Sequence, residues 1–468
     1  MDTPIPDLSE MLQRQRKAWR ANTPDLAQRL DDLARLRTAF KARLEAFASA
    51  VSGDFGRRPR VETLLADGMP VLHEIDHVRR KLRRWMHPQR VAADATFLPA
   101  RCEVIPKPLG VVGIVSPWNY PVNLALVPMV DALAAGNHVL LKTSEHTPRT
   151  SALLAELLAE VFPSERVAVV QGGVDVAAAF TALPFDHLLF TGSTAVGAKV
   201  LATAAHNLTP VTLELGGKSP AVVAPGCVNA RNVGRIAAGK FLNAGQTCIA
   251  PDYVLVQEAE CDTLLALLRE YVACHYPSLR DGMDYASIVN DAQYARLRDW
   301  LGEARAAGAK IIPLPDAAAN DPSRRIFAPT VVLDAPESTT LMQEEIFGPV
   351  LPVVAYREFD GAIEYVNARP RPLALYVFDD DLARTRRVLD ACIAGGVAVN
   401  DTVFQFAQSR LPFGGIGPSG MGAYHGYAGF LAFSKQMPVF RQARWSATGW
   451  LRPPYGERVE RLLGFLLK

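Results

Sequence analysis

Four short apolar runs decide the fold: VVGIVS (111–116), HVLLK (138–142), VAVVQG (167–172) and HLLFTG (187–192). Each run has the length of a β-strand, and a segment long enough for a helix separates it from the next one. Strands that alternate with helices form a parallel sheet covered by helices on both faces, which is why such strands are apolar throughout. The sequence therefore predicts an α/β fold for this part of the chain.

A second α/β series follows the first. It starts near Val211 and continues through four further apolar runs: YVLVQ (253–257), PTVVL (329–333), LPVVAY (351–356) and LALYVF (373–378). The length of 468 residues exceeds the roughly 250–300 at which one hydrophobic core stops growing, yet no low-complexity linker separates the two series. We therefore expect two interlocked parallel-sheet α/β domains. Helices are predicted at 8–50 and 71–86, and the turn-rich stretch 91–108 predicts an arm or hairpin that leaves the domain.

The charge balance narrows the function classes. A formal net charge of +2 argues against a protein that mainly binds nucleic acid, because phosphate binding needs a strong positive field. The predicted helix 71–86 has a basic face, which is either a nucleic-acid site or a solvated surface or oligomer edge. We favour the second interpretation because no aromatic residues interleave with the charges. The face consists of Arg79, Arg80, Lys81, Arg83 and Arg84.

The six cysteines are scattered without a CxxC pair, so we expect neither a zinc site nor a disulfide framework. The first residues lack the pattern of a secretory signal, and the apolar runs are shorter than the roughly 20 residues of a membrane-spanning helix. These features predict a cytoplasmic protein with reduced thiols, no metal and no membrane span.

Two segments are candidates for binding a phosphate-containing ligand. FTGSTAVG (190–197) follows a strand and opens a helix, whose N-terminus offers free N–H groups and a positive dipole end. Its spacing is GxxxxG, so it could equally be an ordinary turn. Lys142 and Glu145 follow another strand at its carboxyl end, where they could reach the ribose hydroxyls of a dinucleotide or simply begin a helix as a surface pair.

Three residues are candidates for chemistry on a substrate. Cys248, in GQTCIA, lies on a turn that could expose its sulfur to a cleft as a nucleophile. Glu214 lies between two leucines, where burial would raise its pKa toward that of a general base, although a salt-bridged core residue would show the same pattern. Asn119, in PWNYP, could donate to an oxyanion or belong to a rigid turn. The segment EEIFGP (344–349) adds carboxylates and an aromatic ring before another strand.

In combination, these segments resemble the aldehyde dehydrogenase superfamily. The resemblance covers about residues 8–440 and rests on PWNYP, FTGSTAVG, LELGGK, GQTCIAPD, EEIFGPV and LPFGGIGPSGMGAYHG, in the order of the family. The segments VTLELGGKSP, PLALYVF and SGMGAYHG are similar in sequence to those of the class 3 branch, whose members are typically dimers. Within that branch, DFGRRPRVETLLAD (54–67) and FDHLLFTGSTAVG (185–197) resemble bacterial enzymes that act on coniferyl aldehyde.

The resemblance implies a role for each candidate. Cys248 would add to the aldehyde carbon, Asn119 and the Cys248 backbone N–H would hold the oxyanion, and Glu214 would activate the water that hydrolyses the thioester. NAD would be the cofactor, with NADP possible. Its binding residues would be Trp118, Lys142, Glu145, Gly192, Ser193, Val196, Gly197, Glu345 and Phe347. Tyr120, Phe404 and Phe406 would supply aromatic walls to a substrate funnel, or they are core residues.

The same resemblance implies a division of the chain. Residues 1–88 and 109–210 would form the NAD-binding domain, 211–396 the catalytic domain, and 89–108 with 397–468 a β oligomerisation arm and tail of a homodimer. Gly456 to Lys468 predicts a short basic amphipathic helix that docks on the partner subunit or caps the funnel, or else binds a membrane surface. We expect no nucleic-acid partner.

The choice of cofactor and of substrate depends on finer features. Most relatives carry proline after the residue matching Lys142, and here it is Thr143. Glu145 should repel a 2′-phosphate and favour NAD, although class 3 relatives with this glutamate can accept both cofactors. An aromatic aldehyde is the expected substrate, and a medium-chain aliphatic aldehyde is the nearest rival. Two alternatives are less expected. One is an enzyme that transfers the thioester to coenzyme A, which the presence of Glu214 disfavours, and the other is a non-catalytic protein that binds RNA or a membrane.

Overall fold

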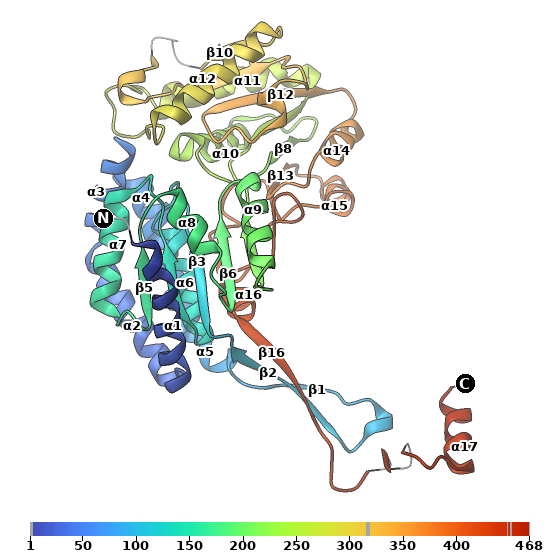
Figure 1. The fold of residues 1–468 in the computed structure, drawn as a ribbon. Coiled ribbons are helices and arrows are strands. Elements are labelled where there is room, and N and C mark those ends of the chain that lie inside the picture. Colours follow the sequence, from blue (N-terminus) through green and yellow to red (C-terminus); the bar gives the residue numbers. More distant parts are fainter. Residues whose placement is uncertain (1–2, 315–318, 447, 450–451, 468) are drawn as a thin grey trace.

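A six-stranded sheet organises the first half of the molecule (Figure 1). The computed structural model describes residues 3–314, 319–446, 448–449 and 452–467. The strand order is β15-β7-β6-β3-β4-β5, and all pairs are parallel except β15 with β7. The strands are β3 (Val111–Val115), β4 (His138–Lys142), β5 (Val167–Val170), β6 (His187–Thr191), β7 (Val211–Glu214) and β15 (Gly420–Met421). The four strands predicted from apolar runs are confirmed.

Helices cover both faces of this sheet, as predicted. One face packs against α6 and α7, which are backed by α2, α3 and α5, and the other face packs against α1, α8 and α9. The bounds are α1 (Ile5–Ala21), α2 (Leu26–Ala42), α3 (Leu44–Phe55), α5 (Met69–Trp85), α6 (Asn123–Ala135), α7 (Pro148–Val161), α8 (Val174–Thr181) and α9 (Thr194–Ala205). Between α3 and α5 lie α4 (Arg60–Thr63) and a π-helical turn (Leu64–Gly68).

A seven-stranded sheet organises the second half, with the order β10-β11-β12-β9-β8-β13-β14. All its pairs are parallel except β10 with β11. The strands are β8 (Pro220–Val223), β9 (Tyr253–Gln257), β10 (Lys310–Pro313), β11 (Thr330–Leu333), β12 (Val350–Tyr356), β13 (Ala374–Phe378) and β14 (Gly396–Val399). Its helices are α10 (Ala230–Phe241), α11 (Cys261–His275), α12 (Asp291–Ala306), α13 (Thr340–Gln343), α14 (Phe359–Asn367) and α15 (Leu382–Ala391).

The border between the two sheets differs from the expected one. The strand at Val211, expected to open the second series, is β7 and pairs with β6, so the second sheet begins with β8 at Pro220. Strand β14 belongs to the second sheet, although residues 397–399 were expected in the arm. Periodicity identifies strands but not their neighbours, because pairing depends on contacts distant in sequence. The largest cluster of buried apolar residues joins Val112 of the first sheet with Val254 of the second.

A three-stranded ribbon extends away from the body (Figure 1). It contains β1 (Gln89–Val91), β2 (Arg101–Pro108) and β16 (Ser434–Arg441), all antiparallel, which confirms the predicted hairpin. Helix α16 (Gly426–Ala432) precedes β16 and packs on α5 and α6. The predicted amphipathic tail contains α17 (Glu457–Leu466), while Lys468 lies outside the described residues. In the described part of the chain, no helix combines the length and apolarity needed to cross a membrane.

Candidate active site

A cavity of about 600 Å³ lies at the carboxyl ends of the first sheet's strands. This is the edge where open parallel sheets bind ligands. Segments that follow β3, β4, β6 and β7 form one wall, and residues of the second half close the other. Segments far apart in the sequence thus meet at one site. The candidate residues on its surface are Trp118, Asn119, Lys142, Glu145, Gly192, Ser193, Val196, Glu214, Cys248, Glu345 and Phe347.

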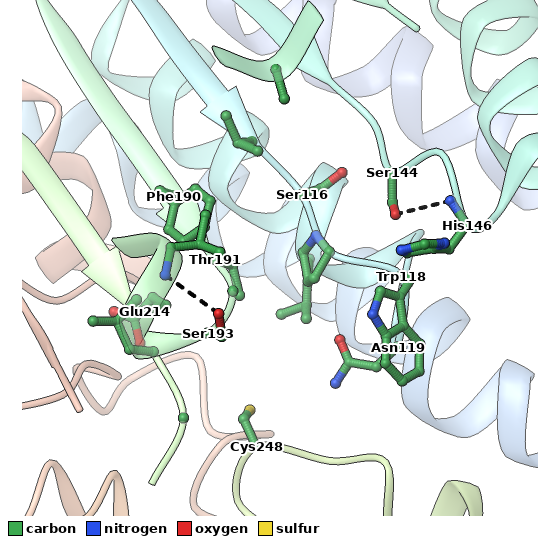
Figure 2. Close-up of a pocket in the computed structure, with 18 of the residues that line it drawn as sticks. Ser116, Trp118, Asn119, Ser144, His146, Phe190, Thr191, Ser193, Glu214 and Cys248 are labelled. Carbon is green, nitrogen blue, oxygen red and sulfur yellow. Dashed lines mark hydrogen bonds between the residues drawn. The ribbon is translucent and has the colours of Figure 1, made fainter. Parts of the chain in front are cut away.

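Cys248 lies at the end of a tight turn that the local sequence makes possible. Asn243 and Ala244 adopt positive φ angles of 51°, and Gly245 has φ 75°. A side chain at position 245 would clash with the backbone carbonyl oxygen of Gly348, so glycine is required there. The thiol of Cys248 is free and faces the cavity (Figure 2). Burial raises its pKa, and the carboxylates of Glu345 and Glu214 raise it further.

Glu214 is the last residue of β7 and is only 2% exposed. Gly420 of β15 pairs with it on one side, and the backbone N–H of Gly192 donates to its carbonyl oxygen at 3.0 Å on the other. Neither carboxylate oxygen has a hydrogen-bond partner among the described residues. Burial therefore raises the pKa of this carboxyl well above its usual value. When it is ionised, a carboxylate with a raised pKa is a stronger base than a solvated one and can accept a proton from a water molecule in the cavity.

Asn119 lies in the loop between β3 and α6, and its side chain faces the same space as Cys248 (Figure 2). Its amide nitrogen donates to the carbonyl oxygen of Gln246 at 3.1 Å. An amide nitrogen carries two hydrogens, so a second one is left for a ligand in the cavity. This donor and the thiol of Cys248 line the same cavity.

The other end of the cavity combines a helix N-terminus with polar side chains. Ser193 caps α9, its hydroxyl accepting from the backbone N–H of Val196 at 3.4 Å (Figure 2). Lys142 is buried, donates to the carbonyl oxygen of Thr143 at 2.7 Å and lies 3.9 Å from the Glu145 carboxylate. Free N–H groups of a helix start suit a phosphate, and a lysine with a carboxylate suits ribose hydroxyls.

Glu345 and Phe347 approach the cavity from the second half. The ring of Phe347 meets the ring of Trp118 edge to face, with 5.3 Å between centroids. Burial raises the pKa of Glu345 to about 8, and the nearby Asp252 carboxylate contributes. Arg296, on α12, also lines the cavity, and it donates to the carbonyl oxygen of Ile346 at 2.8 Å.

The cavity has the donor and acceptor set that a dinucleotide needs. Besides the two carboxylate oxygens of Glu214, the buried Oγ1 of Thr143 and Oε1 of Glu345, both on residues that line the cavity, have no hydrogen-bond partner among the described residues. Buried polar atoms are normally paired, so these two fit a polar ligand that brings the missing partners. Lys142, Glu145, Ser193 and Glu345 would hold NAD(P), whose nicotinamide supplies the hydride acceptor.

Four predicted site residues lie outside the cavity surface. A side chain at Gly197 would meet Leu215 at 2.5 Å, so this glycine allows α9 to pack closely. Tyr120 is buried, and its hydroxyl lies 2.6 Å from that of Thr247. Phe406 packs edge-on against Phe413, and Phe404 is 65% exposed. The funnel wall that these three aromatic residues would form therefore stays a prediction.

Several cavity residues were not predicted from the sequence. Ser116, Thr143, Ser144 and His146 follow strands at the same sheet edge, and this position was the signal that could have identified them. Gln293 and Arg296 lie on the amphipathic helix α12, where polar residues look like ordinary solvated surface.

The chain is similar over nearly its whole length to several known proteins. A probable coniferyl aldehyde dehydrogenase of Pseudomonas aeruginosa is 48% identical over 98% of this chain and 96% of its own. A substrate-bound structure of Staphylococcus aureus AldH superposes with a TM-score of 0.92 at 34% identity, covering 98% of this chain and 99% of that one. A Mycobacterium tuberculosis aldehyde dehydrogenase complexed with NAD+ superposes with a TM-score of 0.84 at 26% identity, over 94% and 91%.

The aldehyde dehydrogenase family model matches residues 8–439, nearly the whole chain. The family, the fold and the relatives thus agree with the expected resemblance. The chain belongs to the aldehyde dehydrogenase family and is an oxidoreductase that oxidises an aldehyde with NAD(P).

Proposed function

We propose that the chain oxidises an aromatic aldehyde of the coniferyl type to its carboxylic acid, with NAD as the preferred cofactor. One observation carries the catalytic part of the proposal. Cys248, Glu214 and Asn119, which come from three separate segments, line a single cavity whose far end has the helix start and the Lys142–Glu145 pair.

Cys248 is the nucleophile in this proposal. Its sulfur adds to the aldehyde carbon while the thiol proton passes to a water molecule in the cavity, and the product is a thiohemiacetal whose oxygen carries the negative charge. The second amide hydrogen of Asn119 and the backbone N–H of Cys248 donate to that oxyanion. NAD(P), held by Lys142, Glu145, Ser193 and Glu345, would supply the acceptor for the hydride that the thiohemiacetal loses, which would leave a thioester on the sulfur.

Glu214 is the general base for the second half of the reaction. It takes a proton from a water molecule, whose oxygen attacks the thioester carbon, so the carboxylic acid leaves and the thiol of Cys248 is restored. The raised pKa of Glu214 supports this role, because its carboxylate is a stronger base than a solvated one. A hydrolytic base in the cavity also favours an acid product over transfer to coenzyme A.

Replacement of the nucleophile tests the mechanism. The Cys248→Ala variant should lose turnover while its dissociation constant for NAD stays within about twofold of the parent. Calorimetric titration with NAD and absorbance of NADH measure the two quantities. Residual turnover above about 1% of the parent value would contradict the assignment of Cys248, since a covalent route cannot bypass its nucleophile.

The proposed cofactor preference depends on Glu145. Its carboxylate lies on the cavity wall beside Lys142, where it would repel the 2′-phosphate of NADP. We expect kcat/KM to be higher with NAD than with NADP, and Glu145→Gln to reduce that ratio. Equal or better activity with NADP in the parent enzyme would refute the preference.

The proposed substrate class is supported by the 48% identical relative, whose name refers to coniferyl aldehyde. A panel of coniferaldehyde, benzaldehyde and octanal tests it by kcat/KM. A clear preference for octanal would replace the aromatic assignment with a medium-chain aliphatic one.

The proposal also retains the expectation of a cytoplasmic homodimer, in which 1–88 and 109–210 bind the cofactor and 211–396 carry Cys248.

A further inference from the structure

A fully buried arginine lies beside the loop that carries Asn119. Arg58 is 1% exposed and follows α3 in the chain. Its Nη1 donates to the backbone carbonyl oxygen of Asn119 at 3.1 Å and lies 3.1 Å from Oδ2 of Asp67. The guanidinium also lies over two aromatic rings, at 4.8 Å from the centroid of Tyr120 and 5.3 Å from that of Phe55.

Asp67, the counter-ion of Arg58, holds the other end of the same loop. Oδ1 of Asp67 accepts from the backbone N–H groups of Val122 and Asn123 at 3.1 and 2.9 Å, where α6 begins. Asp67 lies in the π-helical turn Leu64–Gly68, and such turns add a residue to a helix and redirect its side chains. The Arg58–Asp67 pair therefore fixes the loop at Asn119 and at the helix start.

The residues that Arg58 contacts are also bonded to the turn before Cys248. The carbonyl oxygen of Asn119 accepts a second hydrogen bond, from Nδ2 of Asn243 at 3.1 Å. The Asn119 amide donates to Gln246, and the Tyr120 hydroxyl is bonded to Thr247. A shift of the guanidinium would therefore move Asn119 relative to the nucleophile.

We propose that Arg58 is a positioning residue, which acts through the backbone carbonyl of Asn119 to aim the Asn119 amide at the oxyanion formed on Cys248. This inference depends on the proposed function of Asn119. Only a planar guanidinium can place its faces against two rings while its edge donates to a carbonyl and forms an ion pair with a carboxylate. Lysine can supply the charge but not this geometry.

Stability alone does not account for Arg58. Its Nε and Nη2 have no hydrogen-bond partner among the described residues. A buried arginine with unsatisfied donors is a weak source of stability, because desolvation opposes the attraction to its counter-ion. Arg166, in the same half of the molecule, is better satisfied, since its Nε and Nη2 both donate to Asp32, at 3.1 and 2.8 Å, and among the described residues only its Nη1 lacks a partner.

Arg58→Lys is the decisive variant, because it keeps the charge beside Asp67 and removes the planar fork. A misplacement on the order of 1 Å costs roughly 100-fold, so we expect the pre-steady-state rate of NADH formation to fall by roughly 10- to 100-fold. The KM for NAD should stay within about twofold. Arg166→Lys, a buried arginine away from the cavity, is the matched control and should lower Tm without slowing this step.

A double-mutant cycle with Asn119→Ala separates positioning from a structural role. Loss of an oxyanion donor costs roughly 100- to 1,000-fold, and Arg58→Lys added to Asn119→Ala should then cost less than about threefold more. Full additivity, or an Arg58→Lys rate equal to that of the parent, would overturn the role of Arg58. If Asn119→Ala itself keeps the parent rate, the proposed oxyanion site fails first, so the two failures are distinct.

Discussion

At the scale of single residues, burial of Glu214 makes its carboxylate a stronger base but makes the folded chain less stable at high pH. Its carboxyl has no partner among the described residues, and burial raises its pKa above the ordinary value of 4.5. The folded chain then binds the proton more tightly than the unfolded chain, so this group makes folding less favourable as pH rises from about 4.5. Each unit by which the folded pKa exceeds the unfolded one costs about 1.4 kcal/mol at high pH.

Glu214→Gln should therefore be more stable than the parent at pH 8 and similar to it at pH 4.5, where the glutamate is largely protonated. We expect a difference in the free energy of unfolding of at least roughly 1 kcal/mol at pH 8, measured by urea denaturation. The same variant should form one equivalent of NADH per site and stop, because hydrolysis of the thioester lacks its base. A stability difference independent of pH would contradict the linkage.

The thiol of Cys248 offers a second test at this scale, through the charge of Glu345. The pKa of Glu345 is raised to about 8, so its carboxyl group is mostly neutral below pH 8. Above pH 8 the group is mostly a carboxylate, whose negative charge disfavours ionisation of the Cys248 thiol. Iodoacetamide, which reacts with the thiolate, should label the free enzyme slowly at neutral pH. Glu345→Gln should label roughly three- to tenfold faster than the parent above pH 8 and at a similar rate below pH 7.

Mass spectrometry of the labelled peptide assigns the rate to Cys248, and Cys274 serves as the internal control because it is exposed. The control cysteine should react equally in both proteins. Faster labelling of Cys248 at every pH would indicate that the substitution opened the cavity and did not remove a charge.

At the scale of elements, the end of β4 determines how the adenine side of the cavity is built. The backbone N–H of Thr143 donates to the carbonyl oxygen of Val170 at 3.2 Å, which extends the pairing of β4 with β5. Proline at this position could not make this bond, because it has no backbone N–H. The hydroxyl of Thr143 is buried on the cavity wall without a partner among the described residues, so it is available to a ligand.

Thr143→Val should weaken NAD binding by roughly threefold, because it keeps the backbone bond to Val170 and removes only the hydroxyl. Thr143→Pro, which loses both, should bind NAD no better than the valine variant. Tryptophan fluorescence quenching by NAD measures both dissociation constants. Unchanged binding in the valine variant would mean that the hydroxyl does not meet the cofactor.

The elements themselves could largely be predicted from the sequence, and their neighbours could not. Apolar runs of strand length identified β3, β4 and β9 because parallel strands are buried on both faces. The pairing of β7 with the two-residue strand β15 joins Glu214 to Gly420, and no local pattern exists for a contact so distant in sequence. Arg58 illustrates the same limit in the site, because an arginine in a basic segment carries no signal of burial.

At the scale of the whole molecule, the site exists only where the two halves meet. The first sheet supplies Asn119 and Glu214, and the second half supplies Cys248 and Glu345. The shared apolar core fixes the two walls of the cavity relative to each other, since packed interiors resist small displacements. This shared border explains why the sequence contains no linker between the two series of strands.

The ribbon of β1, β2 and β16 extends away from the body of the molecule (Figure 1). Among the described residues, β16 pairs with β2 on one side only, and most of its side chains are exposed. Phe440 is 54% exposed, and its ring contacts that of Phe97 edge to face at 6.0 Å between centroids. Exposed apolar side chains on an open strand edge are typical of a surface that a second chain covers.

Phe440→Asp should therefore weaken the proposed homodimer, because it places a charge where the partner would bury an aromatic ring. We expect the dissociation constant of the dimer to rise by at least roughly 30-fold in sedimentation equilibrium, the cost of a hot-spot residue. Leu382→Asp is the matched control, since Leu382 is 84% exposed at the start of α15 in the body of the molecule. Its dimer should be as stable as the parent's, and Tm should change little in either variant. A Phe440→Asp protein that remains as tightly dimeric as the parent would place the interface elsewhere, and a monomeric parent would exclude the homodimer itself.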